Sequence, residues 1–111
     1  MAVSYKVLGQ SKPSAATLTS LYTVPVGAGN YAVVSTLNVC NITSDLDEIR
    51  VAIRIAGSAI SDEEYIVYGQ SVGPYQTQSF TIGITLAATD VVSVYSLNGK
   101  CSFNLFGSEN S

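Results

Sequence analysis

The sequence lacks histidine and tryptophan altogether, and it has a single methionine and only two cysteines among 111 residues. Histidine is the commonest general base and a frequent zinc ligand. Its absence removes the Ser-His-Asp and Cys-His catalytic arrangements and most zinc sites. We therefore expect no catalytic residues, no metal and no cofactor, and a protein that is not an enzyme.

Charged residues are also scarce. They make up 12% of the chain, with five basic and eight acidic residues and a formal net charge of −3. A phosphate-binding surface needs clustered Lys and Arg, so nucleic acid is not an expected partner. A surface with so few charges leaves exposed strand edges unprotected, which favours burial against neighbouring subunits over life as a free monomer.

Long apolar runs are missing as well. No stretch approaches the roughly 18 to 20 residues that span a bilayer, and the N-terminus has no basic segment followed by an apolar one. We expect no membrane contact and synthesis in a cytoplasm. The two thiols, Cys40 and Cys101, lie in apolar strand patterns and are expected to be buried free cysteines rather than a disulfide.

What the chain does contain is a series of short alternating segments. In the segments 49–55 and 80–86 every second residue is large and apolar, which is the period of a half-buried strand. The segment 31–41 is apolar on both faces and predicts a central strand. Leu18 and Leu21 break the period of their strand and predict a bulge. Further strands are predicted at 4–10, 17–24, 65–68, 91–97 and 101–106.

Turn residues separate these segments and indicate the fold class. The dipeptide Asn98-Gly99 tolerates the positive φ angles of a type I′ hairpin turn, so the last three strands are predicted to form a C-terminal meander. About eight strands at intervals of roughly ten residues are typical of all-β proteins. We predict one domain over residues 1–111, an antiparallel β-sandwich of jelly-roll or immunoglobulin-like topology.

The acidic residues fall in two clusters with a loop-like composition. One holds Asp45, Asp47 and Glu48, and the other runs from Asp62 to Glu64. Such acids suit a glycosidase pair of carboxylates, or a calcium site, since hard cations need only clustered oxygens. Their polar, turn-like context is more typical of solvated surface acids, and this is the interpretation that we favour.

Two arginines are candidates for contact with a protein partner. Arg50 and Arg54 lie four residues apart on the polar face of a predicted strand. Arginine makes bidentate pairs with carboxylates and is enriched at interfaces, so the two side chains could meet acids of a neighbouring subunit. Pairing within the chain, with Asp47, Glu48 or Glu63, is the alternative, and the sequence leaves both open.

The seven tyrosines are a second source of contact area. Tyr75 follows Gly73-Pro74 in a predicted turn, and it is the best candidate for an exposed ring. Such a ring can be an interface residue or can stack under a sugar, although several of the other tyrosines must edge the core.

Phrases spread over nearly the whole chain carry a resemblance to a known group of proteins. They are YKVLGQ (5–10), LYTVP (21–25), VVST (33–36), VCN (39–41), YIVY (65–68), GITLAATDVVSVY (83–95) and FNLFGSE (103–109). Together they resemble short virion structural proteins of tailed bacteriophages, of the type found in cyanophages and other marine phages. These phrases mark strands and turns, and none of them is a catalytic motif.

The resemblance implies a small β-sandwich component of a virus particle. The leading expectation is a capsid decoration (cement) protein, made in the host cytoplasm, that binds the capsid surface in many copies and stabilises contacts between major capsid proteins. The major capsid protein is then the expected partner, with copies of the chain itself as a further option. A tail, baseplate or fibre module is one alternative. A carbohydrate-binding sandwich that recognises a host surface is the other.

Overall fold

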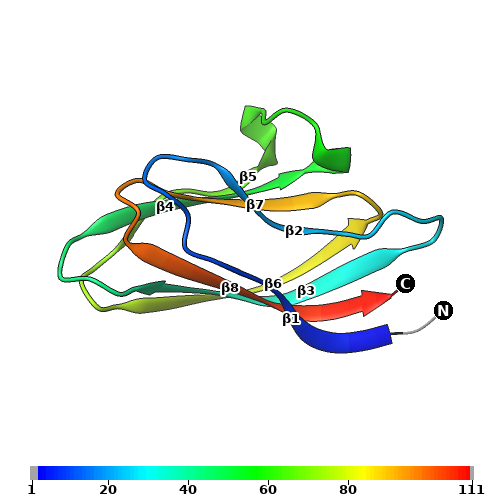
Figure 1. The fold of residues 1–111 in the computed structure, drawn as a ribbon, viewed down its shortest axis with the longest axis horizontal. Helices are drawn as coiled ribbons and strands as arrows, with labels where there is room; N and C mark the ends of the chain where they lie inside the picture. Colours follow the sequence, from blue (N-terminus) through cyan, green and yellow to red (C-terminus); the bar gives the residue numbers. More distant parts are fainter. Residues whose placement is uncertain (1–2, 111) are drawn as a thin grey trace.

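The computed structural model describes residues 3–110, which form two four-stranded antiparallel sheets packed face to face (Figure 1). The strands are β1 (Val3–Ser11), β2 (Thr19–Thr23), β3 (Tyr31–Asn41), β4 (Asp47–Arg54), β5 (Tyr65–Val72), β6 (Thr77–Ala87), β7 (Val91–Ser96) and β8 (Cys101–Asn110). Two 3-10 turns, η1 (Ile55–Gly57) and η2 (Asp62–Glu64), stand beside the sheet that contains β5 (Figure 1). Within the described residues, no helix is long and apolar enough to cross a membrane.

The strand order identifies a jelly roll. Sheet A has the order β1-β8-β3-β6, and sheet B has the order β2-β7-β4-β5. The neighbours β1/β8, β2/β7, β3/β6 and β4/β5 are all antiparallel, which is the pattern of a long hairpin rolled up on itself. The predicted all-β antiparallel sandwich is confirmed, and the jelly roll is the topology that the chain adopts.

The predicted C-terminal meander is wrong. β6 and β8 belong to sheet A and β7 belongs to sheet B, so residues 97–100 arch between the sheets instead of closing a hairpin. Gly99 has a φ of 69°, but Asn98 is not among the residues with positive φ, as a type I′ turn requires. The physical reason lies in β4, where the carboxylate of Asp47 accepts hydrogen bonds from the N–H groups of Asn98 and Lys100.

The strands with the clearest alternation fold as predicted. β3 lies between β8 and β6 in the interior of sheet A, and in β6 the side chains of Phe80, Ile82 and Ile84 pack against the core. In these strands the predicted alternation of buried and exposed residues fails only at the end of β4. Ile55 is 60% exposed because the strand ends at Arg54 and the chain turns into η1.

Bulges interrupt the pairing in both sheets. The predicted irregularity in β2 is confirmed, because its register with β7 shifts at Leu21. In sheet A the register shifts between Val7 and Gly9 of β1 and between Val34 and Thr36 of β3. These two shifts are adjacent, since they flank the same stretch of β8. Adjacent bulges increase the local twist and bend the sheet at this level.

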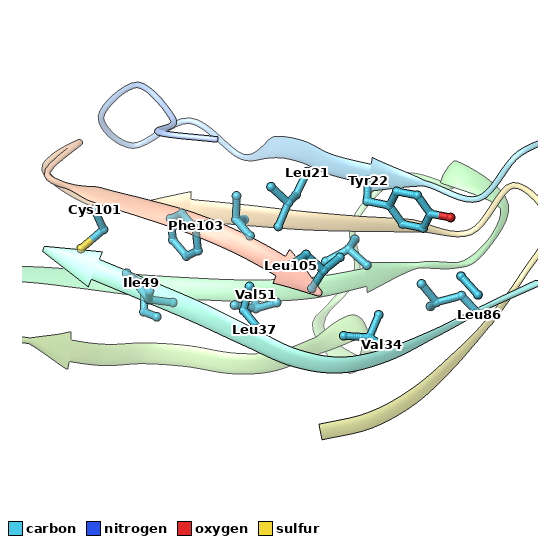
Figure 2. Close-up of a cluster of buried hydrophobic side chains, with 14 of the residues drawn as sticks. Leu21, Tyr22, Val34, Leu37, Ile49, Val51, Leu86, Cys101, Phe103 and Leu105 are labelled. Carbon is cyan, nitrogen blue, oxygen red and sulfur yellow. The ribbon is translucent and has the colours of Figure 1, made fainter. Parts of the chain in front are cut away.

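The core fills the space between the two sheets (Figure 2). Its largest fully buried side chains include Leu37, Ile49, Phe103 and Leu105, which come from both sheets. Cys101 also lies in this core, and burial raises the pKa of its thiol to about 12. Both cysteines are free, as predicted, but the burial predicted for Cys40 is wrong, because it is only half-buried.

A short polar chain closes the core at its Tyr22 end. The Tyr22 hydroxyl donates to one carboxylate oxygen of Glu109, and Lys6 Nζ donates to the other at 3.0 Å. Burial raises the pKa of Tyr22, and the neighbouring carboxylate raises it further. The bond from Tyr22 and the bond from Lys6 lower the pKa of Glu109. Both groups therefore keep their ordinary ionisation at neutral pH, and they join β2 of sheet B to β1 and β8 of sheet A.

Candidate protein interface

The outer face of sheet B carries an arginine held between two tyrosine rings. The Cζ atom of Arg50 lies 4.3 Å from the ring centroid of Tyr68 and 4.3 Å from that of Tyr95. The register explains this arrangement, because Arg50 of β4 pairs with Tyr68 of β5 on one side and with Tyr95 of β7 on the other. Each cation–π contact of this kind stabilises by about 0.5–1 kcal/mol at exposed sites.

Arg54 is bound to its own chain rather than presented to a partner. Its Nε donates to the carbonyl oxygen of Ser58 at 2.7 Å, and its Nη2 donates to that of Gly57 at 2.9 Å. These bonds hold the loop that follows β4. Arg54 therefore has a structural role, and its predicted part in an interface has no support in this arrangement.

Pairing of the two arginines with acids of the same chain, the alternative that the sequence left open, does not occur. Within residues 3–110 the ion pairs are Lys6–Glu109 and Lys100–Asp45, at 3.0 and 3.8 Å, and neither contains an arginine. Tyrosine rings and loop carbonyls have taken the place of the expected carboxylates.

The prediction that Asp47 is a solvated surface acid is wrong. It is not a solvated loop residue, because it begins β4 and is 0% exposed. Its carboxylate accepts hydrogen bonds from the N–H groups of Glu48, Asn98 and Lys100 at 2.8, 2.9 and 3.0 Å, and from the hydroxyl of Ser96. Burial alone would raise the pKa of Asp47, but these bonds outweigh it and hold the pKa below its ordinary value. Asp47 therefore fastens the arch at 97–100 to sheet B.

Tyr75 lies in the turn between β5 and β6, and the residue is 72% exposed, in agreement with the prediction. Its φ of 56° is in the left-handed region, and its N–H donates to the carbonyl oxygen of Thr43 at 3.0 Å. This turn is separate from the middle of sheet B, where Arg50 lies. The three residues chosen from the sequence therefore do not form one site.

Sheet A presents an outer face without an unpaired charge. Its four strands contain only two charged residues, Lys6 and Glu109, and these pair with each other at 3.0 Å. Sheet B is different, because its strand β4 alone carries four charged residues. The two faces of the sandwich thus differ in the kind of surface they can bind.

The apolar part of this face, which we call the sheet A patch, gathers side chains from β1, β3 and β8. Its members are Val3, Tyr5, Val7, Tyr31, Val33 and Phe106. Tyr5 is 85% exposed, the highest value among the exposed large apolar side chains. The register places them on one face, since Tyr5 and Val33 both pair with Ser108, and Val7 pairs with Phe106.

A shallow hollow of about 380 Å³ lies within the sheet A patch. Its lining residues are Tyr5, Lys6, Val33, Ser35, Phe106, Gly107 and Ser108. The hollow lies where the adjacent bulges bend the sheet. The only sequence signal for this site was the alternation that put Tyr5 and Val7 on the same face of the first strand.

A second hollow of about 380 Å³ lies beside η2 and is lined by Asp62, Tyr65 and Tyr68. The two tyrosine rings meet edge to face, with centroids 4.9 Å apart and planes at 85°. An acceptor carboxylate beside aromatic rings is a combination that can bind a polar ring with hydroxyl groups. Among the described residues, no cluster of His, Cys, Asp and Glu side chains could hold a metal ion.

No protein-family model matches the chain, and no curated protein matches it significantly.

Proposed function

We propose that the protein is a non-enzymatic structural protein of a phage virion, a decoration protein that binds the outer shell in many copies. The observation that carries this proposal is the outer face of sheet A, which has an apolar patch and no unpaired charge among its strands. Interface cores are depleted of charge and enriched in aromatic residues, and a large exposed apolar patch marks an interaction site. The resemblance to short virion proteins supports the shell as the partner. The use of jelly rolls in viral capsids adds an analogy of fold.

Burial of surface, and not chemistry, is the proposed mechanism. An interface of ordinary size buries about 800 Å² on each partner. The hollow beside Tyr5 offers a place for an apolar side chain of the major capsid protein. Modest affinities add through multivalency when the contact is repeated over a shell, so that contacts between capsid proteins are strengthened. The net charge of −3 suits a surface that faces away from packaged DNA.

Tyr5→Glu is expected to weaken rebinding to virions from which the protein has been stripped. The substitution puts a charge into the middle of the sheet A patch, and we expect an affinity about 30-fold weaker, the effect of losing an interface residue that contributes about 2 kcal/mol. Rebinding and the heat resistance of the particles are measured together. Tyr75→Glu is the matched control, because that ring is also exposed but lies outside the patch.

Two results would contradict the proposal. If stripped particles keep their heat resistance and do not rebind the wild-type protein, the decoration role is wrong. If Tyr75→Glu weakens rebinding and Tyr5→Glu does not, the contact lies at the β5–β6 turn and not on sheet A. Copy number in whole particles adds a further check, since hundreds of copies indicate the head and a handful indicate a tail, baseplate or fibre.

Carbohydrate binding is a second candidate function, and the hollow beside η2 favours it. Tyr68 is largely exposed, stacks edge to face with Tyr65 and lies beside the carboxylate of Asp62. If this hollow binds a sugar, Tyr68→Ala weakens binding on a glycan array about tenfold, the loss expected for one stacking ring. Tyr75→Ala leaves it unchanged. An array without any signal would eliminate this candidate.

A further inference from the structure

We propose that β6 is a dimerisation edge, at which the same strand of a second copy pairs antiparallel about a twofold axis. The pairing joins the two A sheets into one continuous sheet. β6 pairs with β3 on one side only, so its other side carries backbone N–H and C=O groups without a strand partner. Such an edge is a template for another strand unless the chain protects it.

The other three edge strands each carry a recognised form of protection. β1 has the charge of Lys6 and a register shift between Val7 and Gly9. β2 is only five residues long and contains a shift of its own. β5 has two register shifts against β4, and one of them falls at Gly69, which has a φ of 72°. Three edges of the sandwich are therefore unsuited to pairing.

β6 has little protection of this kind. It runs for 11 residues, and its sequence TQSFTIGITLA contains neither a charged residue nor a proline. Its register shifts once against β3, which leaves Thr77–Thr81 as a continuously paired stretch. The outward side chains of Thr77, Ser79, Thr81 and Thr85 are exposed, small and polar. They offer no steric or electrostatic barrier to a neighbouring strand.

The apolar side chains of β6 provide the driving force for dimerisation. Phe80, Ile82 and Ile84 point toward the core but remain only half-buried, and so does Val67 of β5. β5 and β6 are the last strands of their sheets, so these side chains lie along the open flank of the sandwich. Pairing at β6 brings a second flank against the first and removes this apolar surface from water.

A second copy of the chain fits this edge better than an unrelated strand. An antiparallel pair about a twofold axis places each residue of β6 opposite another residue of β6. Because the strand has no charge, no like charges meet across the axis, and facing threonines are favourable cross-strand pairs. The twofold axis is perpendicular to the sheet, so the dimer presents both sheet A patches in the same direction.

The test is the mass of the full chain in solution, measured by sedimentation over a range of concentrations. We expect a dimer at about 0.1 mM, where a micromolar complex is fully formed. Thr81→Lys/Thr85→Lys, which adds charge at exposed positions of the edge, is expected to weaken the dimer at least about tenfold. Thr23→Lys, which adds a single charge of the same sign at an exposed position of the protected strand β2, leaves the dimer unchanged.

Hydrogen exchange locates the contact. The amides of β6 should gain protection as concentration rises, and those of β2 should not. A wild-type chain that stays monomeric at about 0.1 mM overturns the proposal, and so does a mass that grows beyond the dimer, because a twofold contact is closed. Dissociation by Thr23→Lys, with no effect of the β6 substitutions, also overturns it. None of these results depends on rebinding to virions, so the proposed decoration role is tested separately.

Discussion

Asp47→Asn is expected to lower the free energy of unfolding by about 3 kcal/mol. Asparagine has one acceptor oxygen where aspartate has two. Its NH₂ group is a donor, so it would face donors that are bonded to the carboxylate of Asp47 in the wild-type protein. These donors are the N–H groups of Glu48, Asn98 and Lys100 and the hydroxyl of Ser96. Buried donors that lose their acceptor are costly, and the arch at 97–100 loses its attachment to β4. Urea denaturation measures the change.

Asp45→Asn is the matched control for this prediction. Asp45 lies two residues away, but its side chain is 69% exposed and it pairs with Lys100 at 3.8 Å. Exposed pairs of this kind contribute less than about 1 kcal/mol. Equal losses in the two variants would mean that the buried hydrogen bonds of Asp47 do not hold the arch.

The pH dependence of stability gives a second measurement on the same residue. The pKa of Asp47 in the folded protein lies below its ordinary value, which is about 3.9 in an unfolded chain. Its carboxylate therefore stabilises the fold above that pH, and the contribution is lost as pH falls through the folded-state pKa. The lowered pKa of Glu109 acts in the same direction. Wild type should lose stability steeply below about pH 4, and Asp47→Asn less steeply.

Gly107→Ala is expected to destabilise the protein by about 3 kcal/mol, at the upper end for an overpacked site. A Cβ atom at this position would lie 2.1 Å from the carbonyl oxygen of Val33 and 3.0 Å from the Cα atom of Val34. Both atoms belong to the backbone of β3, the strand that joins β8 to β6, so no side-chain rotation relieves the clash. The melting temperature should fall by more than about 10 °C.

Gly83→Ala supplies the control, because the two glycines lie in the same sheet. A Cβ atom at Gly83 meets nothing within 4 Å, and Gly83 is not among the glycines with positive φ. This variant should be neutral or more stable by up to about 1 kcal/mol, since alanine restricts the unfolded chain. A melting temperature that falls equally in both variants would show that loss of glycine flexibility, and not the contact with β3, is responsible.

The sequence predicted the strands better than their arrangement. A two-residue period is a local property, so β3 and β4 were found within two residues of their ends, and β6 within three residues. The assignment of strands to sheets depends on pairing between distant segments. Asn98-Gly99 has the composition of a hairpin turn, but Asp47, about fifty positions earlier in the chain, accepts hydrogen bonds from the N–H groups of Asn98 and Lys100 and holds an arch instead.

The candidate interface was predicted less well, for a related reason. Alternation in the first strand separates Tyr5 and Val7 from Lys6, but it does not say which side faces the core. The rings around Arg50 come from β5 and β7, so they become visible only when the register of three strands is known. Exposed Tyr75 was found because a turn residue after Gly73-Pro74 needs no such information.

The rolled-up order of strands also has a kinetic consequence. Of the strand pairings within residues 3–110, only β4/β5 joins strands that are consecutive in the chain, whereas β1 pairs with β8, the last of the eight strands. Chain entropy is lost in bringing such distant segments together before their contacts form, so folding is slow for a chain of this size. Before the chain has folded, β6 is not paired with β3, and it carries no charge that would repel other chains. Folding of the chain and aggregation through β6 therefore compete when the protein is produced at high concentration.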